Sequence, residues 1–303
     1  MVQLGKTLLI ANPVAQNGNG AAAAHRAGDE LRRKLPAGEF ELVMTEKPLH
    51  GQRLAEQAGA FDTVIAHGGD GLIHEVVNGL MAIDEAARPT LGVLPMGSGN
   101  DYARTLGLSF DLERSLAQLD TCSPHRFDLG RCNGEYFAET LSFGLDAAIA
   151  LDTVERRRRT GMTGTPLFLA SGIDMLLHQI KEYRFTASID GGEPIESTML
   201  LFAVQVGPTY GGGFKICPEA RTDDGLLDLC IAHPPLGIPK AVFIFLLAKN
   251  AHHTGFKQLE FKQAAALSLC FDEQPPVQID GEPMPAKRYD IEAVPGALNV
   301  LVP

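Results

Sequence analysis

The sequence of 303 residues has no long apolar run, no excess of positive charge and few cysteines. Its longest apolar stretch, residues 241–248, is far below the roughly 20 residues that a membrane-spanning helix needs. The apolar run in residues 1–10 is too short for a signal peptide. The five cysteines are scattered and lack C-x-x-C spacing, which is typical of reduced thiols in a cytoplasmic protein. The net charge of −11 argues against a nucleic-acid partner, because such proteins normally carry a basic surface.

The sequence does contain enough apolar material for two domains, each with a core of its own. In the first half, short β-branched runs alternate with helical patterns. This alternation predicts an α/β domain with a parallel sheet and helices on both faces, a Rossmann-like three-layer arrangement. Strands are expected at residues 7–11, 41–45, 63–65 and 90–94, and a loop at residues 15–20. Ligands of such sheets bind beyond the carboxyl ends of the strands.

After residue 128 the pattern changes to β-like runs with turn signals and fewer helices, which predicts a mainly antiparallel β domain. The runs are residues 136–143, 185–189, 199–206, 228–232, 259–262 and 266–271. A helix-rich insertion at residues 147–179 interrupts them and contains four consecutive arginines at positions 156–159. These arginines fit either contact with an anionic membrane surface or the solvated face of a helix, and both interpretations stay open.

The most informative stretch is residues 63–80, where a β-branched run leads through the glycine turn Gly68-Gly69-Asp70-Gly71 into a helix. A bare glycine backbone lets N–H groups approach an anion at a helix N-terminus. The Asp70 carboxylate would repel a phosphate unless a cation lay between them, so Mg²⁺ with a nucleotide is the natural ligand. The alternative is a tight turn in which Asp70 caps the helix and binds nothing.

A second turn of small residues, 95–101, follows the next predicted strand and ends in Asn100 and Asp101. Both turns are expected at the carboxyl ends of neighbouring strands. Two such turns, each with one aspartate, describe a polyphosphate site with metal ligands better than either turn alone.

Two further acidic motifs lie in the second half of the sequence. Three glycines at positions 211–213 and the run at 223–226 bracket a loop with an acidic turn, which is either a cation site or an ordinary β-turn. Asp280 and Glu282 flank Gly281, as at a hairpin tip that faces water. Phosphoryl transfer needs a base on the acceptor side and a metal ligand, and this compact motif is suited to supply them.

In this combination and order, the motifs resemble those of the diacylglycerol kinase catalytic-domain family, which includes bacterial soluble lipid kinases and sphingosine kinases. The resemblance runs nearly end to end, from Asn12-Pro13 through both glycine turns to Asp280-Gly281-Glu282. It implies that the first domain binds ATP with Mg²⁺, and that the C-terminal residues from about 290 to 303 return to it. The implied domains are therefore residues 1–128 with about 290–303, which bind ATP, and residues 129–289, which bind the lipid.

The resemblance also implies roles for individual residues. Asp70 and Asp101 would organise metal and water around the phosphates. The residues implied to bind the nucleotide are Asn12, Pro13, Thr45, Gly68, Gly69, Asp70, Gly71, Glu75, Gly97, Ser98, Gly99, Asn100 and Asp101. In the second domain Glu282 is carried over as the catalytic base, with Asp280 as the alternative. A second, structural Mg²⁺ would be held by the Asp224 carboxylate and the carbonyls of Arg221 and Leu226.

The sequence departs from the bacterial pattern in the turn itself. Leu72 and His74 stand where bacterial members commonly have Thr and Asn, as in sphingosine kinases. One hydroxyl and one amide near the phosphates are therefore missing. These positions face the nucleotide, so they say little about the acceptor.

The sequence therefore predicts an ATP- and Mg²⁺-dependent lipid kinase that phosphorylates a diacylglycerol-like or sphingoid hydroxyl. Its partner would be the lipid substrate. The protein would be cytoplasmic and would contact the membrane surface peripherally. A homodimer is kept as a candidate assembly. The alternatives are a kinase of a soluble acceptor such as NAD, and a catalytically silent regulator that binds nucleotide or lipid.

Overall fold

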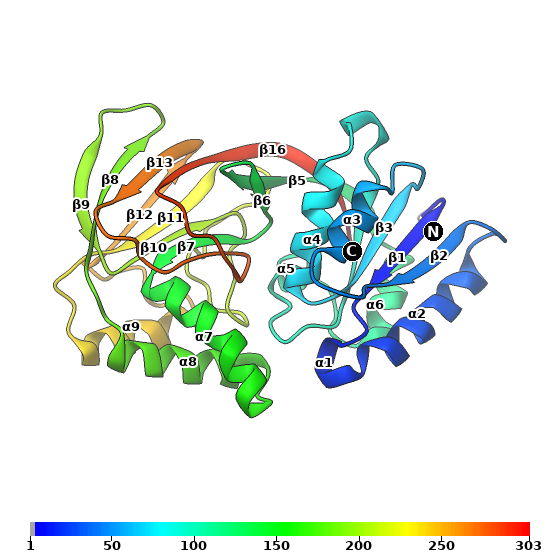
Figure 1. Ribbon diagram of the computed structural model, residues 1–303, viewed down its shortest axis with the longest axis horizontal. Coiled ribbons are helices and arrows are strands. Elements are labelled where there is room, and N and C mark those ends of the chain that lie inside the picture. Colours follow the sequence, from blue (N-terminus) through cyan, green and yellow to red (C-terminus); the bar gives the residue numbers. More distant parts are fainter. Residues whose placement is uncertain (1–3) are drawn as a thin grey trace. The chain divides into compact units, whose positions relative to one another are not determined.

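The computed structural model describes residues 4–303 (Figure 1). The chain forms two compact units. Unit 1 contains the residues up to Phe127 together with Gly296–Pro303, and unit 2 contains Asp128–Pro295. The chain therefore passes from one unit to the other twice.

Unit 1 is built on a parallel sheet whose strands run in the order β2-β1-β3-β4-β16. Strong β-formers and near-complete burial of β1, β3 and β4 explain these strands, since both faces of the sheet are covered. Their bounds are β1 (Thr7–Ala11), β2 (Phe40–Met44), β3 (Thr63–Gly68), β4 (Thr90–Pro95) and the end of β16 (Arg288–Val302).

Helices cover both faces of this sheet (Figure 1). On one face, Leu31 of α2 and Leu116 of α6 pack against Leu9, Ile65 and Leu301 of the sheet. On the other face, α4 packs on β3 and on α3. The helices are α1 (Ala15–Gly18), α2 (Gly20–Lys34), α3 (His50–Glu56), α4 (Asp70–Met81), η1 (Glu85–Ala87), α5 (Asp101–Thr105) and α6 (Leu112–Leu119).

The predicted loop at residues 15–20 was wrong, because most of it is the short helix α1. The chain turns back on itself there. The Gly18 N–H bonds to the Val14 carbonyl at 3.3 Å, and the Ala21 N–H bonds to the Pro13 carbonyl at 3.1 Å. These bonds satisfy backbone groups that an open loop would leave to water.

Unit 2 contains two sheets. One is antiparallel in the order β12-β11-β10-β7-β14-β15, and the other runs β16-β13-β8-β9 with β5 and β6 attached. Phe143 and Phe202 of the first sheet meet Phe185 and Tyr289 of the second in the core, with the rings of Phe143 and Tyr289 4.8 Å apart. The strands are β5 (Ser123–Cys132), β6 (Glu135–Phe137), β7 (Thr140–Gly144), β8 (Tyr183–Ile189), β9 (Ile195–Met199), β10 (Leu201–Gln205), β11 (Leu227–Ala232), β12 (Leu259–Ala264), β13 (Ala266–Phe271), β14 (Val277–Ile279) and β15 (Glu282–Pro283).

The predicted fold class, a parallel α/β domain followed by an antiparallel β domain, is confirmed. Two predicted strands are each divided in the structure. The run 136–143 breaks between β6 and β7, because the N–H groups of Ala138 and Glu139 turn to the Asp280 carboxylate. The run 199–206 breaks at Leu200, where the chain leaves the sheet of β9 and enters that of β10.

Three helices complete unit 2: α7 (Leu145–Thr160), α8 (Gly164–His178) and α9 (Ile238–Ala248). α8 packs against both α7 and α9. The predicted helix-rich insertion at 147–179 is confirmed as α7 and α8. None of the helices in residues 4–303 combines the length and the apolar character that crossing a bilayer requires.

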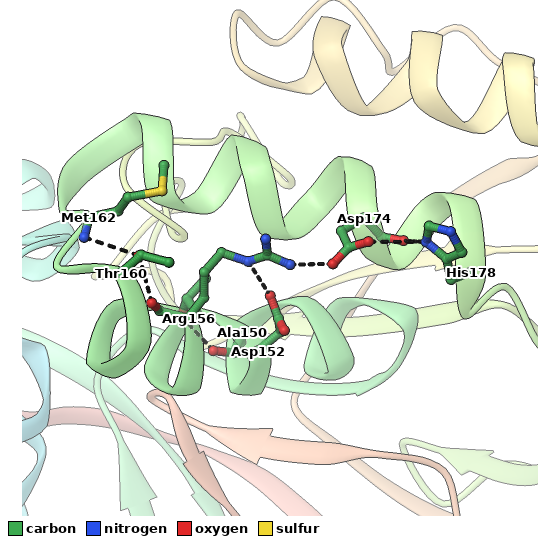
Figure 2. Close-up of polar contacts among 8 residues, drawn as sticks. Ala150, Asp152, Arg156, Thr160, Met162, Asp174 and His178 are labelled. Atoms are coloured by element: carbon green, nitrogen blue, oxygen red, sulfur yellow. Dashed lines mark hydrogen bonds and ion pairs between the residues drawn. The ribbon is translucent and has the colours of Figure 1, made fainter.

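The four arginines at the end of α7 do not form a single surface. Arg156 has a side chain only 14% exposed and bonds to Asp152 on its own helix and to Asp174 on α8 (Figure 2). Asp174 also meets His178. The other three arginines are exposed. Arg156 therefore joins α7 to α8 and does not belong to an exposed arginine cluster, whereas contact of Arg157, Arg158 and Arg159 with a membrane stays a prediction.

Candidate functional site

The carboxyl ends of four strands of unit 1 lie at one edge of the sheet. The parallel register pairs Ala11 with both Met44 and His67, and Gly68 with Pro95. Backbone bonds continue past these ends: the Asn12 N–H reaches the His67 carbonyl at 3.0 Å, and the Thr45 N–H reaches the Ala11 carbonyl at 2.8 Å. The sequence-predicted residues that follow each strand are thereby brought to a common edge.

The two glycine turns touch backbone to backbone. A Cβ added to Gly97 would lie 2.4 Å from the Gly69 Cα, and a Cβ added to Gly69 would lie 2.8 Å from the Gly97 Cα. A Cβ on Gly68 would lie 2.7 Å from the Leu72 side chain. These positions need glycine because there is no room for a side chain, and the result is a stretch of bare backbone shared by both turns.

Each glycine turn leads directly into a helix that begins with an aspartate. Asp70 is the first residue of α4, and its carboxylate accepts a hydrogen bond from the Tyr102 N–H of α5 at 3.3 Å. Asp101 is the first residue of α5; it is nearly buried, and its Oδ1 lies 3.9 Å from the Arg104 Nε. Asp70 therefore ties the first turn to the helix that follows the second.

Asn100 shapes the second turn. Its backbone is left-handed, with φ of 52°, and its side chain bonds twice to Gly97. The Asn100 Oδ1 accepts from the Gly97 N–H at 2.6 Å, and the Asn100 Nδ2 donates to the Gly97 carbonyl at 3.1 Å. Ser98 and Gly99 lie within the turn that these bonds close.

Glu75 and Asn12 also bond to local backbone. The Glu75 carboxylate accepts from the Leu49 N–H at 2.8 Å and the Gly51 N–H at 2.9 Å, at the start of α3. Glu75 thus fixes the segment between Thr45 and α3. The Asn12 Oδ1 accepts from the Val14 N–H at 3.1 Å and closes the turn that contains Pro13.

His67, directly before the first turn, is fully buried in β3. Its Nδ1 lies 3.1 Å from the Leu94 carbonyl, so this nitrogen carries the proton. Burial lowers the pKa of His67 below its usual value. His67 is therefore a neutral side chain that links β3 to β4.

In unit 2, Asp280 and Glu282 lie at a tight hairpin between β14 and β15. Asp280 and Gly281 both have positive φ, 45° and 93°. The Asp280 carboxylate accepts from three consecutive N–H groups, those of Ala138 at 2.8 Å, Glu139 at 3.1 Å and Thr140 at 2.9 Å. Glu282 is exposed. The two carboxylates therefore differ: Asp280 holds the hairpin to the chain between β6 and β7, whereas Glu282 faces water.

The acidic turn at 223–226 is held by carboxylate bonds to its own backbone. The Asp224 Oδ1 accepts from the Leu226 N–H at 3.1 Å. Asp128, which the sequence did not single out, is buried and accepts from the Gly225 N–H at 2.6 Å. Within residues 4–303 there is no group of three or more His, Cys, Asp or Glu side chains that could hold a metal ion. The Mg²⁺ site assigned to Arg221, Asp224 and Leu226 stays a prediction.

Within the three glycines at 211–213, Gly212 packs closely against α8. A Cβ on Gly212 would lie 2.8 Å from the Phe168 ring of α8. Lys249, after α9, donates from Nζ to the Gly212 carbonyl at 2.7 Å. The turn thereby joins α8 to the end of α9.

Next to this turn lies a buried pair that the sequence did not reveal. The Tyr210 hydroxyl donates to Asp146, in the first turn of α7. Burial raises the pKa of Asp146 to about 6, and the bond from Tyr210 opposes the rise. The only signal in the sequence was the acidic Asp146 among the apolar residues that begin α7.

Comparison with known proteins places these features in a family. Residues 6–132 match the model of the diacylglycerol kinase catalytic domain. Residues 139–302 match that of the YegS C-terminal NAD kinase beta sandwich-like domain. The chain belongs to the diacylglycerol kinase catalytic-domain family. The resemblance read from the motifs is confirmed, and this family is one of kinases.

Relatives match this family member over most of its length. A protein of Chromohalobacter salexigens named "Probable lipid kinase YegS-like" is 31% identical over 84% of the chain and 80% of the relative. The "Diacylglycerol kinase" of Bacillus subtilis is 29% identical over 73% of the chain and 71% of the relative.

Solved structures share the fold. A diacylglycerol kinase from Bacillus anthracis has a TM-score of 0.76 at 20% identity, covering 100% of this chain and 98% of that one. An NAD kinase from Archaeoglobus fulgidus, solved in complex with ATP, has a TM-score of 0.54 at 14% identity, covering 98% of this chain and 92% of that one. At these identities the likeness is one of fold alone.

Proposed function

We propose that the chain is an ATP- and Mg²⁺-dependent lipid kinase that phosphorylates a hydroxyl of a diacylglycerol-like or sphingoid lipid. The observation that carries the proposal is the backbone contact between Gly69 and Gly97, with Asp70 and Asp101 each starting a helix beside it. The names of the relatives, lipid kinase and diacylglycerol kinase, support the acceptor class.

The residues at this edge fit a magnesium nucleotide. No side chain covers the backbone at Gly69 and Gly97, and α4 begins there, so its N-terminus can receive phosphate oxygens. Asp70 and Asp101 supply the carboxylate oxygens that Mg²⁺ prefers, so these two would hold the metal. When bound, Mg²⁺ neutralises charge that develops on the transferred phosphoryl group. Asn100 keeps the second turn in shape, and Glu75 holds the segment that follows Thr45 beside it.

On the acceptor side we propose that Glu282 takes the proton of the lipid hydroxyl. Glu282 is exposed and carries a carboxylate suited to general base catalysis. Asp280 is a positioning residue, because its carboxylate is engaged by three backbone N–H groups. We further propose that the enzyme works in the cytoplasm at the membrane surface, where its substrate resides.

Incubation with γ-labelled ATP and Mg²⁺ tests the function, with diacylglycerol, sphingosine, phosphatidylglycerol and NAD offered separately. Labelled lipid is the expected result. Label on NAD selects a kinase of a soluble acceptor, and tight ATP binding without transfer selects a silent regulator. Either outcome contradicts the proposal.

A substitution at Asp70, compared with one at an exposed aspartate elsewhere, tests the role of this carboxylate in turnover. Asp70→Asn removes the charge while keeping an oxygen for the Tyr102 N–H, so the fold is retained. Turnover is expected to fall by at least about 100-fold, because metal binding and phosphate alignment both depend on this carboxylate. Asp29→Asn, at an exposed site on α2, is the control and keeps full turnover. Equal rates for the two variants would contradict the role of Asp70.

A further inference from the structure

Helix α9 is apolar on both sides. Its inner residues Ala241, Ile244 and Ala248 are buried. The outward side chains include Phe243 and Leu246, which are 55% and 44% exposed. A surface helix of a globular protein normally presents polar residues on its outer side. Lys240 is the one charged residue of α9, and the rest of its outer side is apolar.

The inner side already accounts for the packing of α9 within unit 2. The Phe245 ring stacks on the Phe214 ring, with centroids 4.7 Å apart. A Cβ on Gly172 of α8 would lie 2.1 Å from Phe245, so the two helices are in close contact there (Figure 1). The core does not need the outward Phe243 and Leu246.

Aromatic and basic side chains gather beside this outer surface. Phe243 and Phe256 make an edge-to-face contact at 6.2 Å, and the Lys240 Nζ lies 5.7 Å from the centre of the Phe256 ring. Lys257, the next residue, is exposed like Lys240. We call Phe243, Leu246, Phe256, Lys240 and Lys257 the α9 face.

The charge of this segment differs from that of the rest of the chain. Residues 229–259 contain no aspartate or glutamate, although the whole chain has 37 such residues and a net charge of −11. The segment carries three lysines. Exposed aromatic and aliphatic residues with lysines beside them, in a segment without acidic residues, match the chemistry of an anionic bilayer surface.

We propose that the α9 face docks the protein on an anionic lipid bilayer. Phe243 and Leu246 enter the headgroup region, and Lys240 and Lys257 meet the anionic headgroups. This inference rests on the proposed lipid kinase function for its physiological meaning. Vesicle binding, however, is measured without ATP, so docking and phosphoryl transfer can fail separately.

The chain contains no tryptophan, so F243W introduces a single fluorescent reporter on the α9 face. With vesicles of phosphatidylcholine and phosphatidylglycerol we expect a blue shift of its emission and quenching by brominated lipid. Vesicles of phosphatidylcholine alone should produce a weaker response. I195W, at a residue 46% exposed on β9, is the matched control and should not respond. Unchanged F243W emission, or an equal response of both reporters, overturns the proposal.

Co-sedimentation with the same vesicles measures how strongly each variant partitions onto the bilayer. F243S/L246S should lower the partition coefficient at least about tenfold, because two apolar side chains no longer leave water. K240Q/K257Q should lower it by about fivefold per lysine, and added salt should reduce this difference. I195S should bind like the unmodified chain.

Two further measurements distinguish bilayer docking from misfolding and from self-association. Circular dichroism should show that every variant is folded, and turnover of lipid in detergent micelles should be unchanged in F243S/L246S. Sedimentation velocity reports on a second copy of the chain as the occupant. If F243S/L246S dissociates an oligomer while vesicle binding stays the same, the α9 face is a subunit interface and the proposal is wrong.

Discussion

Asp280 accepts hydrogen bonds from three consecutive backbone N–H groups, whereas Glu282, two residues later, is exposed. A carboxylate held in this way stabilises the chain between β6 and β7. The hydrogen bonds indicate a structural role for Asp280. We propose the exposed Glu282 as the general base.

Glu282→Gln and Asp280→Asn should therefore have opposite effects on rate and stability. E282Q is expected to lower kcat by about 10²–10⁴ and to change the free energy of unfolding by less than about 0.5 kcal/mol. D280N is expected to lower the free energy of unfolding by about 2–3 kcal/mol, since its amide meets backbone donors. Urea unfolding and steady-state kinetics measure both. If D280N loses turnover without losing stability and E282Q keeps its rate, the two roles are reversed.

The sequence identified the Asp-Gly-Glu motif but could not separate its two carboxylates. The partners of Asp280 lie 140 to 142 positions earlier in the chain. No local pattern reports contacts at that separation. Asp128 and Asp146 were missed for a related reason, because only tertiary burial distinguishes them from ordinary acidic residues.

At the scale of elements, the two glycine turns behave as one unit. Gly69 and Gly97 come from different strand–helix connections, and neither has room for a Cβ. The bonds of Asn100 to Gly97 and of Asp70 to Tyr102 hold the connections together. Nucleotide affinity should therefore depend on the contact between the turns as well as on each turn alone.

Gly97→Ala should push the turns apart. Its Cβ would lie 2.4 Å from the Gly69 Cα, and backbone atoms cannot move aside as a flexible side chain can. We expect a loss of about 1–3 kcal/mol in the free energy of unfolding and at least about tenfold weaker ATP binding. Calorimetric titration and thermal melting measure the two effects. Gly59→Ala is the control, since its nearest neighbour is 3.7 Å away; a similar loss there would contradict the role of the contact between the turns.

The α7–α8 pair offers a second test at this scale. Arg156 joins the helices through Asp152 and Asp174 (Figure 2). The Arg158 side chain is 77% exposed and, among the ion pairs of the described residues, meets only Glu155 of its own helix. Arg156→Gln should lower the melting temperature by roughly 2–6 °C, because it leaves two carboxylates without their shared partner. Arg158→Gln should leave it unchanged. Equal melting temperatures for the two variants would show that Arg156 does not join the helices.

The periodicity of apolar residues predicts helices and strands that have one apolar and one polar side. The helix at α4 was predicted because its apolar residues recur on one side, and those residues are buried. α9 was seen only as an apolar run, since its outer and inner sides are both apolar. The break at Leu200 was missed because the residues on either side are equally apolar, although they belong to different sheets.

At the scale of the whole molecule, stability depends on pH through buried carboxyls, whose pKa values are raised, and buried histidines, whose pKa values are lowered. Burial raises the pKa of Asp146 to about 6 and that of Asp228 to about 6. Burial lowers the pKa of His67 and His253. The carboxyls contribute stability that is present at low pH and lost as pH rises through about 6. The histidines contribute stability that is lost as pH falls below their ordinary value.

Asp146→Asn isolates one of these groups. The variant keeps an oxygen for the Tyr210 hydroxyl but does not ionise. Relative to the unmodified chain, its stability should rise with pH between about pH 4 and pH 6, by at most about 1.4 kcal/mol per pH unit, and then level off. Differential scanning calorimetry across this range measures the difference. A difference that does not vary with pH would show that Asp146 does not titrate as its burial indicates.

Strand β16 starts in unit 2 and finishes in unit 1, where Val300 pairs with Leu91 and Leu301 enters the core. These residues follow the whole of Asp128–Pro295 along the chain. During translation the ribosome must therefore synthesise all of unit 2 before the last strand of the unit 1 sheet emerges. Unit 2 is one continuous segment and can complete its fold on the ribosome. Unit 1 is synthesised first, but its sheet is complete only when the C-terminal residues emerge.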